Sequence, residues 1–132
     1  MKVVLDTNVL ISAFVFKGKA ATVYHYCVAT ETVFLSDWIL EELTRTLRRK
    51  FNLPEADVQE FLALLSERCS LALPTSPLPN ICRDPDDNHI LQLAEHVAAD
   101  FLVTGDKDLL SLSSFASARI VSPGEFSELF GL

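Results

Sequence analysis

Two kinds of hydrophobic pattern alternate along the chain. Short apolar runs rich in β-branched residues predict buried strands, and longer segments with apolar residues every three or four positions predict helices. The predicted strands are Lys2–Asp6, Thr32–Leu35, Ser70–Leu73, Phe101–Thr104 and Arg119–Val121. The predicted helices are Asn8–Phe14, Ala20–Ala29, Asp37–Lys50, Pro54–Cys69, Pro85–Ala98, Lys107–Leu112 and Pro123–Phe130. This alternation predicts an α/β fold, a three-layer α/β/α sandwich with a mostly parallel central sheet.

The composition is that of a globular protein. The chain has 132 residues, 49% hydrophobic and 22% charged, and no repeat or linker divides it, so we expect one domain over residues 1–132. No apolar run is long enough to span a bilayer, and Asp6, Thr7 and Asn8 interrupt the first apolar stretch. We therefore expect a cytoplasmic protein without membrane association. Its three cysteines form no CxxC pair and are expected to be free, buried thiols.

Two of the predicted strands run directly into acidic residues. The first strand ends at Asp6, and the strand from Phe101 leads through Thr104 and Gly105 into Asp106. In parallel sheets, ligands bind beyond the carboxyl ends of the strands. If the two strands are parallel neighbours, both carboxylates lie at the same edge.

The helix from Pro85 contributes a third acid. Asp87 lies on the same stripe as Ile90, Leu91 and Ala94, where an unpaired carboxylate is costly. Asp84 has a simpler interpretation, as the N-cap residue before the proline. For Asp87 the alternative is a first-turn acid that accepts backbone N–H bonds.

The helix from Asp37 contributes a fourth acid. Glu42 lies at the border of the apolar face, whereas Glu41 points nearly opposite to it and is expected to pair with Arg45. Taken alone, Glu42 is also compatible with an ordinary surface acid. In the turn after Gly105, we expect Asp108 to cap the following helix and Asp106 to face the site.

Asp6, Glu42, Asp87 and Asp106 thus come from separate elements and can meet at one end of the sheet. Clustered carboxylates repel, and oxygen-only ligands select hard cations such as Mg²⁺ or Mn²⁺. Such ions support phosphodiester hydrolysis by activating water. The net charge of −7 argues against a nucleic-acid partner only if these acids are not neutralised by bound metal.

The order and spacing of these motifs resemble those of PIN domains over nearly the whole chain. The matching segments are VVLDTNVLIS, SDWILEEL, RDPDDNHILQLA and FLVTGDKDLL. The resemblance is closest to the small prokaryotic VapC-like toxins of toxin–antitoxin modules. It implies a Mg²⁺- or Mn²⁺-dependent endoribonuclease that uses metal-activated water, has an antitoxin protein as partner, and forms a homodimer or a higher homo-oligomer.

The resemblance also assigns roles to individual residues. It implies that the four acidic ligands are Asp6, Glu42, Asp87 and Asp106, with Asp108 as an additional metal ligand. Thr7, Asn8 and Thr104 match polar positions that support the ligands and metal-bound water.

Several positive or aromatic residues are candidates for further contacts. Arg45, Arg49 and Lys107 can bind RNA phosphates, although Arg49 and its neighbours are equally typical of a solvated helix C-terminus. Phe14, Phe16 and Tyr24 form either an apolar partner surface or part of the core.

Two other functions are compatible with parts of the pattern. A haloacid-dehalogenase-type phosphohydrolase also begins with an Asp after a strand, but it requires a second Asp where this chain has Asn8, and a lysine between Lys50 and Lys107, where none occurs. A catalytically silent PIN fold that binds RNA or protein is the other alternative, and the complete set of acids disfavours it.

Overall fold

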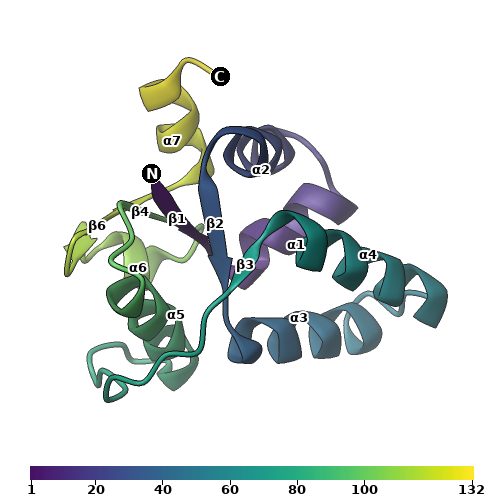
Figure 1. Ribbon diagram of the computed structural model, residues 1–132, viewed down its shortest axis with the longest axis horizontal. Coiled ribbons are helices and arrows are strands. Elements are labelled where there is room, and N and C mark those ends of the chain that lie inside the picture. The colour runs from purple at the N-terminus through teal and green to yellow at the C-terminus, as the bar shows by residue number, and fades with distance from the viewer.

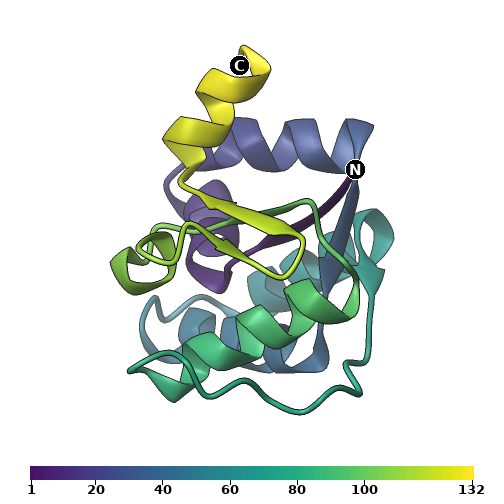
Figure 2. The ribbon, with the colours of Figure 1, turned by 90° about the vertical axis from the view of Figure 1, so that its left-hand side faces the viewer.

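The computed structural model describes residues 1–132 and contains a six-stranded sheet between two layers of helices (Figures 1 and 2). The strands are β1 (Lys2–Leu5), β2 (Thr32–Leu35), β3 (Ser70–Leu71), β4 (Phe101–Val103), β5 (Ser114–Phe115) and β6 (Ala118–Val121). The helices are α1 (Thr7–Val15), α2 (Lys19–Thr30), α3 (Asp37–Arg49), α4 (Glu55–Arg68), α5 (Pro85–His96), α6 (Lys107–Leu110) and α7 (Pro123–Phe130).

The strand order is β3-β2-β1-β4-β6-β5, and all neighbours are parallel except β5 and β6. The two strands that end in acids, β1 and β4, are direct neighbours, with Leu5 opposite Val103. This arrangement confirms the predicted three-layer sandwich with a mostly parallel sheet. It also brings the chain segments after β1 and β4 to the same edge.

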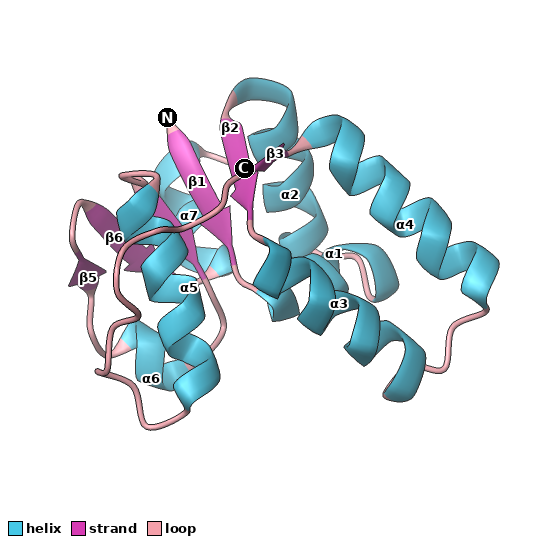
Figure 3. Ribbon diagram, turned by 60° about the horizontal axis from the view of Figure 1, so that its bottom comes forward, coloured by secondary structure: helices cyan, strands magenta, loops and turns pink.

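Helices cover the two faces unequally. α1, α2 and α7 lie on one face of the sheet, and α5 lies across the other (Figure 2). α3 and α4 form an antiparallel pair that projects beyond the β3 edge (Figure 3). The carboxyl ends of the central strands therefore open between α3 on one side and α5 and α6 on the other (Figure 3).

The apolar positions that predicted the elements form the core, a cluster of 32 buried hydrophobic residues. In β1, Val3, Val4 and Leu5 are all inaccessible to solvent, as expected for a strand covered on both faces. In α3, Ile39 and Leu43 are also fully buried, which confirms the face assigned from their spacing. No helix has the length and apolarity that crossing a membrane requires.

Most differences from the predicted elements are at their ends. The helix predicted to reach Ala98 ends at His96, and the positive φ of Ala98 explains why it cannot continue. β5 was not predicted because its two residues lie in a serine-rich stretch without an apolar run. It pairs with β6 in a tight hairpin whose two-residue turn begins at Ala116, a residue at positive φ.

Of the three aromatic residues near the first helices, two belong to the core and one is exposed on the surface. Tyr24 is buried and Phe14 is half-buried against it, with ring centroids 5.0 Å apart, so these two belong to the core. Phe16 is 65% exposed. The three cysteines are free, as predicted, but only Cys27 is fully buried.

Leu102 lies at the centre of the sheet and is fully buried, so we expect Leu102→Ala to lower the free energy of unfolding by about 3 kcal/mol. The loss combines reduced burial with the cavity left where this side chain packs on the face of the sheet. Urea unfolding monitored by circular dichroism measures it. The matched control Leu129→Ala, at a position 46% exposed, should change stability by less than about 0.5 kcal/mol. Equal losses in the two variants would contradict this placement of the core.

Candidate active site

Asp6 follows β1 and is only 5% exposed. Its backbone N–H donates to the carbonyl oxygen of Val103 at 2.9 Å, which extends the pairing of β1 with β4 beyond the strand. Its side-chain Oδ2 accepts a hydrogen bond of 2.7 Å from Thr104 Oγ1. Burial raises the pKa of Asp6, the Thr104 hydroxyl opposes the rise, and the charge of Asp106 adds to it.

Asp106 follows β4 and begins α6. Its Oδ1 accepts hydrogen bonds from the backbone N–H groups of Asp108, at 2.8 Å, and Leu109, at 3.1 Å. Its own backbone N–H donates to Thr104 Oγ1 at 3.0 Å. The hydroxyl of Thr104 therefore connects the two acids, because it donates to the side chain of Asp6 and accepts from the backbone of Asp106. Oδ2 of Asp106 forms no hydrogen bond within the chain.

Asp87 lies in the first turn of α5 and is only 8% exposed, on the buried side of the helix that its spacing predicted. Its Oδ2 is buried and has no hydrogen-bond partner. Burial is the largest cause that raises the pKa of Asp87 to about 7, followed by the negative charges of Asp106 and Asp6. Asp87 is thus a carboxyl group for which the protein supplies no compensating donor.

The helix-capping role at this position belongs to Asp84. Its Oδ1 accepts a hydrogen bond of 3.0 Å from the backbone N–H of Asp86, as the sequence predicted. No backbone N–H donates to the side chain of Asp87. The simpler interpretation of Asp87, as a first-turn acid that accepts backbone hydrogen bonds, is therefore wrong.

Glu42 approaches from α3 on the other side and is half-buried. Burial raises its pKa, the charges of Asp6 and Asp86 add to the rise, and the neighbouring Thr7 hydroxyl and Arg45 oppose it. Thr7 Oγ1 is itself buried and completes no hydrogen bond. Glu42 therefore feels the negative charge of Asp6 after β1 and of Asp86 in the first turn of α5.

The four acids thus lie around one edge of the sheet, but they are not drawn together around a single point. No group of three or more histidine, cysteine, aspartate or glutamate side chains is arranged closely enough to hold a metal ion as it stands. Carboxylate oxygens are nevertheless the donors that hard divalent cations prefer. The unpartnered oxygen of Asp87 is an additional reason to expect a cation here, because a buried carboxylate needs compensation.

Two local predictions about acidic residues are wrong. Asp106, not Asp108, caps α6, because Asp106 occupies the position before the first helical residue. Asp108 lies within the first turn and instead forms an ion pair with Arg83, with Nη2 and Oδ1 2.6 Å apart. Glu41 and Arg45 are both exposed but form no ion pair.

One buried polar residue near the site was not predicted. Asn88 is 3% exposed, and its Oδ1 accepts hydrogen bonds from the backbone N–H groups of Ile81, at 3.1 Å, and Cys82, at 3.0 Å. These bonds fix the segment that leads into α5 and hence the position of Asp87. Asn88 lies one turn before Leu91, on the apolar side of α5, and this spacing could have indicated that its side chain is buried.

The remaining candidates lie at the rim of the site. Asn8 is exposed, and so is Lys107, the first residue of α6 after Asp106. Arg45 and Arg49 are exposed on α3 and form no ion pair with the protein. All four side chains are accessible to solvent, and Arg49 is the last residue of α3, at the end away from the sheet.

Comparison with known proteins places these features in a family. Residues 2–108 match the family model described as PIN domain. An uncharacterised protein of Methanocaldococcus jannaschii is 31% identical over 143 aligned positions, which cover 98% of this chain and 92% of that protein.

Two solved structures share the fold. The structure of VapBC2 from Rickettsia felis, crystallised with a DNA fragment from its promoter, aligns with this chain at a TM-score of 0.66 and 15% sequence identity. The alignment covers 92% of this chain and 98% of the matched VapBC2 chain. The structure of Mycobacterium tuberculosis VapC20, a toxin that cleaves the sarcin–ricin loop, aligns at a TM-score of 0.61 and 16% sequence identity. The alignment covers 89% of this chain and 98% of the VapC20 chain.

The raised pKa of Asp87 predicts that charge at the site destabilises the metal-free fold. An acid whose pKa is higher in the folded than in the unfolded chain lowers the free energy of unfolding once it is ionised. For Asp87 this loss develops as the pH rises from the unfolded pKa, about 4, through the folded pKa, about 7. In EDTA at pH 8, Asp87→Asn should therefore have a free energy of unfolding about 2–4 kcal/mol higher than the native chain. The difference should disappear toward pH 4. Urea unfolding at the two pH values measures both.

The matched control is Glu95→Gln, an exposed acid on the same helix that forms no ion pair. Its stability should equal that of the native chain at both pH values. A native chain that is more stable than Asp87→Asn at pH 8 would contradict the inferred cost of this buried charge.

Proposed function

The chain belongs to the PIN-domain family, and we propose that it is a divalent-metal-dependent endoribonuclease that hydrolyses phosphodiester bonds of RNA. One observation carries this proposal. The buried Oδ2 of Asp87 has no partner although the negatively charged Asp6 and Asp106 lie nearby. A purely structural cluster would be expected to pair such a carboxylate with a donor or a positive charge.

The residues that would hold Mg²⁺ or Mn²⁺ are Asp6, Glu42, Asp87 and Asp106. A divalent ion bound there would polarise a phosphoryl oxygen and make water a better nucleophile near neutral pH. Asp108 can join the set if its ion pair with Arg83 opens.

The chain's own residues prepare this site for a cation. The hydrogen bond from Thr104 orients the carboxylate of Asp6, and the N-cap bonds of Asp106 hold its Oδ1 while Oδ2 stays available. The buried Thr7 hydroxyl is near Glu42, and the exposed Asn8 can contact water or substrate. Because metal ligands must be deprotonated, ion binding would displace the proton that Asp87 retains up to about pH 7.

The biological setting we propose is that of a toxin in a toxin–antitoxin pair, active on RNA in the cytoplasm. The structural neighbours support it, since one is the VapC20 toxin and the other is the VapBC2 assembly. We propose an antitoxin protein as partner, and a homodimer or higher homo-oligomer as the assembled state. Such an acidic chain, with net charge −7, is suited to a basic partner.

Cleavage of labelled RNA tests the proposed activity. We expect cleavage with Mg²⁺ or Mn²⁺ and none in EDTA. Asp6→Asn and Asp87→Asn should each reduce the rate by about 100-fold or more, because losing one ligand removes several kcal/mol of transition-state stabilisation. Glu95→Gln, the exposed acid on α5, should retain the native rate.

Native rates in both aspartate variants would show that the activity does not reside at this site. An RNA that stays intact with every divalent ion, at any protein concentration, would favour the catalytically silent PIN fold. A phospho-aspartate intermediate, detected as acid-stable radiolabel transferred from a phosphate ester, would favour the phosphohydrolase instead.

A further inference from the structure

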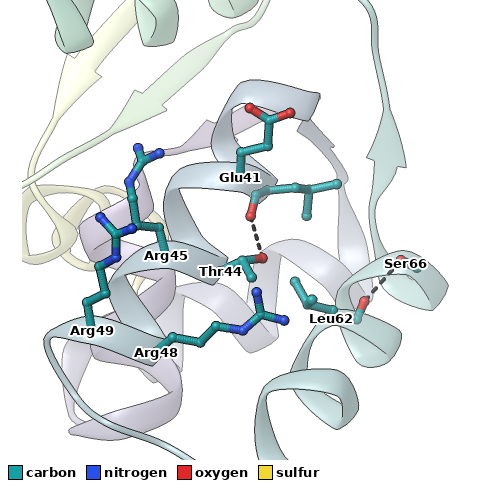
Figure 4. A pocket seen from close by; sticks show the side chains of 8 residues that line it. Glu41, Thr44, Arg45, Arg48, Arg49, Leu62 and Ser66 are labelled. Carbon is teal, nitrogen blue, oxygen red and sulfur yellow. Dashed lines mark hydrogen bonds between the residues drawn. The ribbon is translucent and has the colours of Figure 1, made fainter. Parts of the chain in front are cut away.

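A groove of about 620 Å³ between α3 and α4 carries three arginines in an otherwise acidic protein (Figure 4). The residues that line it are Leu40, Glu41, Thr44, Arg45, Arg48, Arg49, Leu62 and Ser66. Three of the eleven basic residues of the chain therefore face one concave surface, with a single carboxylate among its lining residues. This concentration of positive charge is unexpected on a chain of net charge −7.

The hydrogen-bonding groups of the groove differ in availability. Thr44 Oγ1 donates to the carbonyl oxygen of Leu40 at 2.7 Å, and Ser66 Oγ donates to that of Leu62 at 3.0 Å (Figure 4). These two hydroxyl protons are thus used within their own helices. The groove's capacity to bind a ligand then depends on its guanidinium groups.

Only two of the three arginines are free to bind an external group. Arg48 is held by Glu55, with which its Nε and Nη2 form two hydrogen bonds. Arg45 and Arg49 are exposed and form no ion pair, and Figure 4 shows them together on the side of α3 away from Arg48. Two unpaired guanidinium groups, four residues apart, suit an extended anion with more than one negative group.

The groove and the acidic site share helix α3, which carries Arg45 and Arg49 in the groove and Glu42 in the acidic site. At about 100° per residue, Arg45 and Arg49 lie within about 60° of Glu42 on the helix surface, one and two turns after it. Arg45 follows Glu42 by three residues, a spacing that makes the two side chains neighbours on the helix surface. A chain-like anion that enters the acidic site can therefore run along this side of α3.

We propose that Arg45 and Arg49 bind the phosphates of single-stranded RNA next to the cleaved bond, and that the groove between α3 and α4 receives the adjoining nucleotides. The proposal rests on the proposed ribonuclease function. Arginine forks match phosphate oxygens, and each neutralised phosphate contributes to affinity by releasing counterions. A basic antitoxin segment would be repelled by these arginines, so charge favours RNA over such a partner.

Binding without cleavage tests the proposal. The anisotropy of a short fluorescein-labelled single-stranded RNA, titrated with the full chain in EDTA, gives the affinity at several salt concentrations. The double variant Arg45→Ala/Arg49→Ala should bind at least about tenfold more weakly at low salt. Its slope of log affinity against log salt should be smaller by about 1.4, since each phosphate contact with a single strand contributes about 0.7. The double variant Arg45→Lys/Arg49→Lys should retain the native slope because it keeps both charges.

The matched control is Arg119→Ala, which removes an exposed arginine of β6 that forms no ion pair and lies outside the groove. It should bind RNA like the native chain. Equal affinity and slope for the native chain and the double alanine variant would overturn the proposal, and so would an equal loss in Arg119→Ala. Tight binding of a poly-glutamate peptide through the two arginines, with RNA binding unchanged by their removal, would identify a protein-docking site instead.

This result is separable from the proposed catalysis. Arginine-dependent RNA binding by a chain that cleaves no RNA would support the phosphate site and reject the ribonuclease. All variants replace exposed side chains, and their melting temperatures should match that of the native chain.

Discussion

The site depends on the electrostatic repulsion between the acidic side chains that gather at the carboxyl ends of the central strands. Asp6 and Asp87 are almost completely buried, and Asp106 lies close enough to raise the pKa of both. The protein offsets part of this cost with the Thr104 hydroxyl and with backbone N–H groups at the start of α6. For Asp87 it offers no donor, and that missing compensation is the reason we propose a bound cation at this site.

The fold delivers the acids to this edge through simple topology. β1 and β4 are parallel and adjacent, so the residues that follow them, Asp6 and Asp106, emerge side by side. α5 and α3 begin near the same edge and add Asp87 and Glu42 from opposite sides (Figure 3). The hydrogen bonds from Ile81 and Cys82 to the side chain of Asn88 hold the segment before α5 against the start of that helix, where Asp87 lies.

Much of this arrangement could be predicted from the sequence. Periodicity identified nearly every element, and the stripe formed by Ile90, Leu91 and Ala94 placed Asp87 on the buried side of its helix. The failures have local causes. β5 lies in a serine-rich stretch without an apolar run, so nothing in its sequence indicated a strand. Asp106 and Asp108 can both cap α6, and the position at which the helix begins decides which of them does.

Side-chain pairing was harder to predict than side-chain direction. Glu41 and Arg45 have the spacing of a helical ion pair, but both are exposed, where such a pair gains little over hydration, and no pair forms. Spacing on α3 made Arg45 and Arg49 candidates for binding RNA phosphates. It could not show the groove, because the groove depends on how α4 packs beside α3.

Charge is distributed unevenly over the molecule, so the net charge of −7 does not conflict with the RNA substrate that we propose. The acids gathered at the edge of the sheet would be compensated by divalent ions, while Arg45 and Arg49 on α3 provide positive charge next to them. Local charge therefore matters more than net charge for a nucleic-acid partner.

Direct titration of metal-free protein with Mn²⁺ tests the central claim, that the clustered acids bind a shared divalent ion. Isothermal titration calorimetry at pH 7.5 should show binding to the native chain, with proton release from Asp87 that varies with the ionisation heat of the buffer. Asp6→Asn, Asp87→Asn and Asp106→Asn should each weaken that binding by about tenfold or more. Equal affinity in all three variants and the native chain, or no binding at all, would contradict the claim.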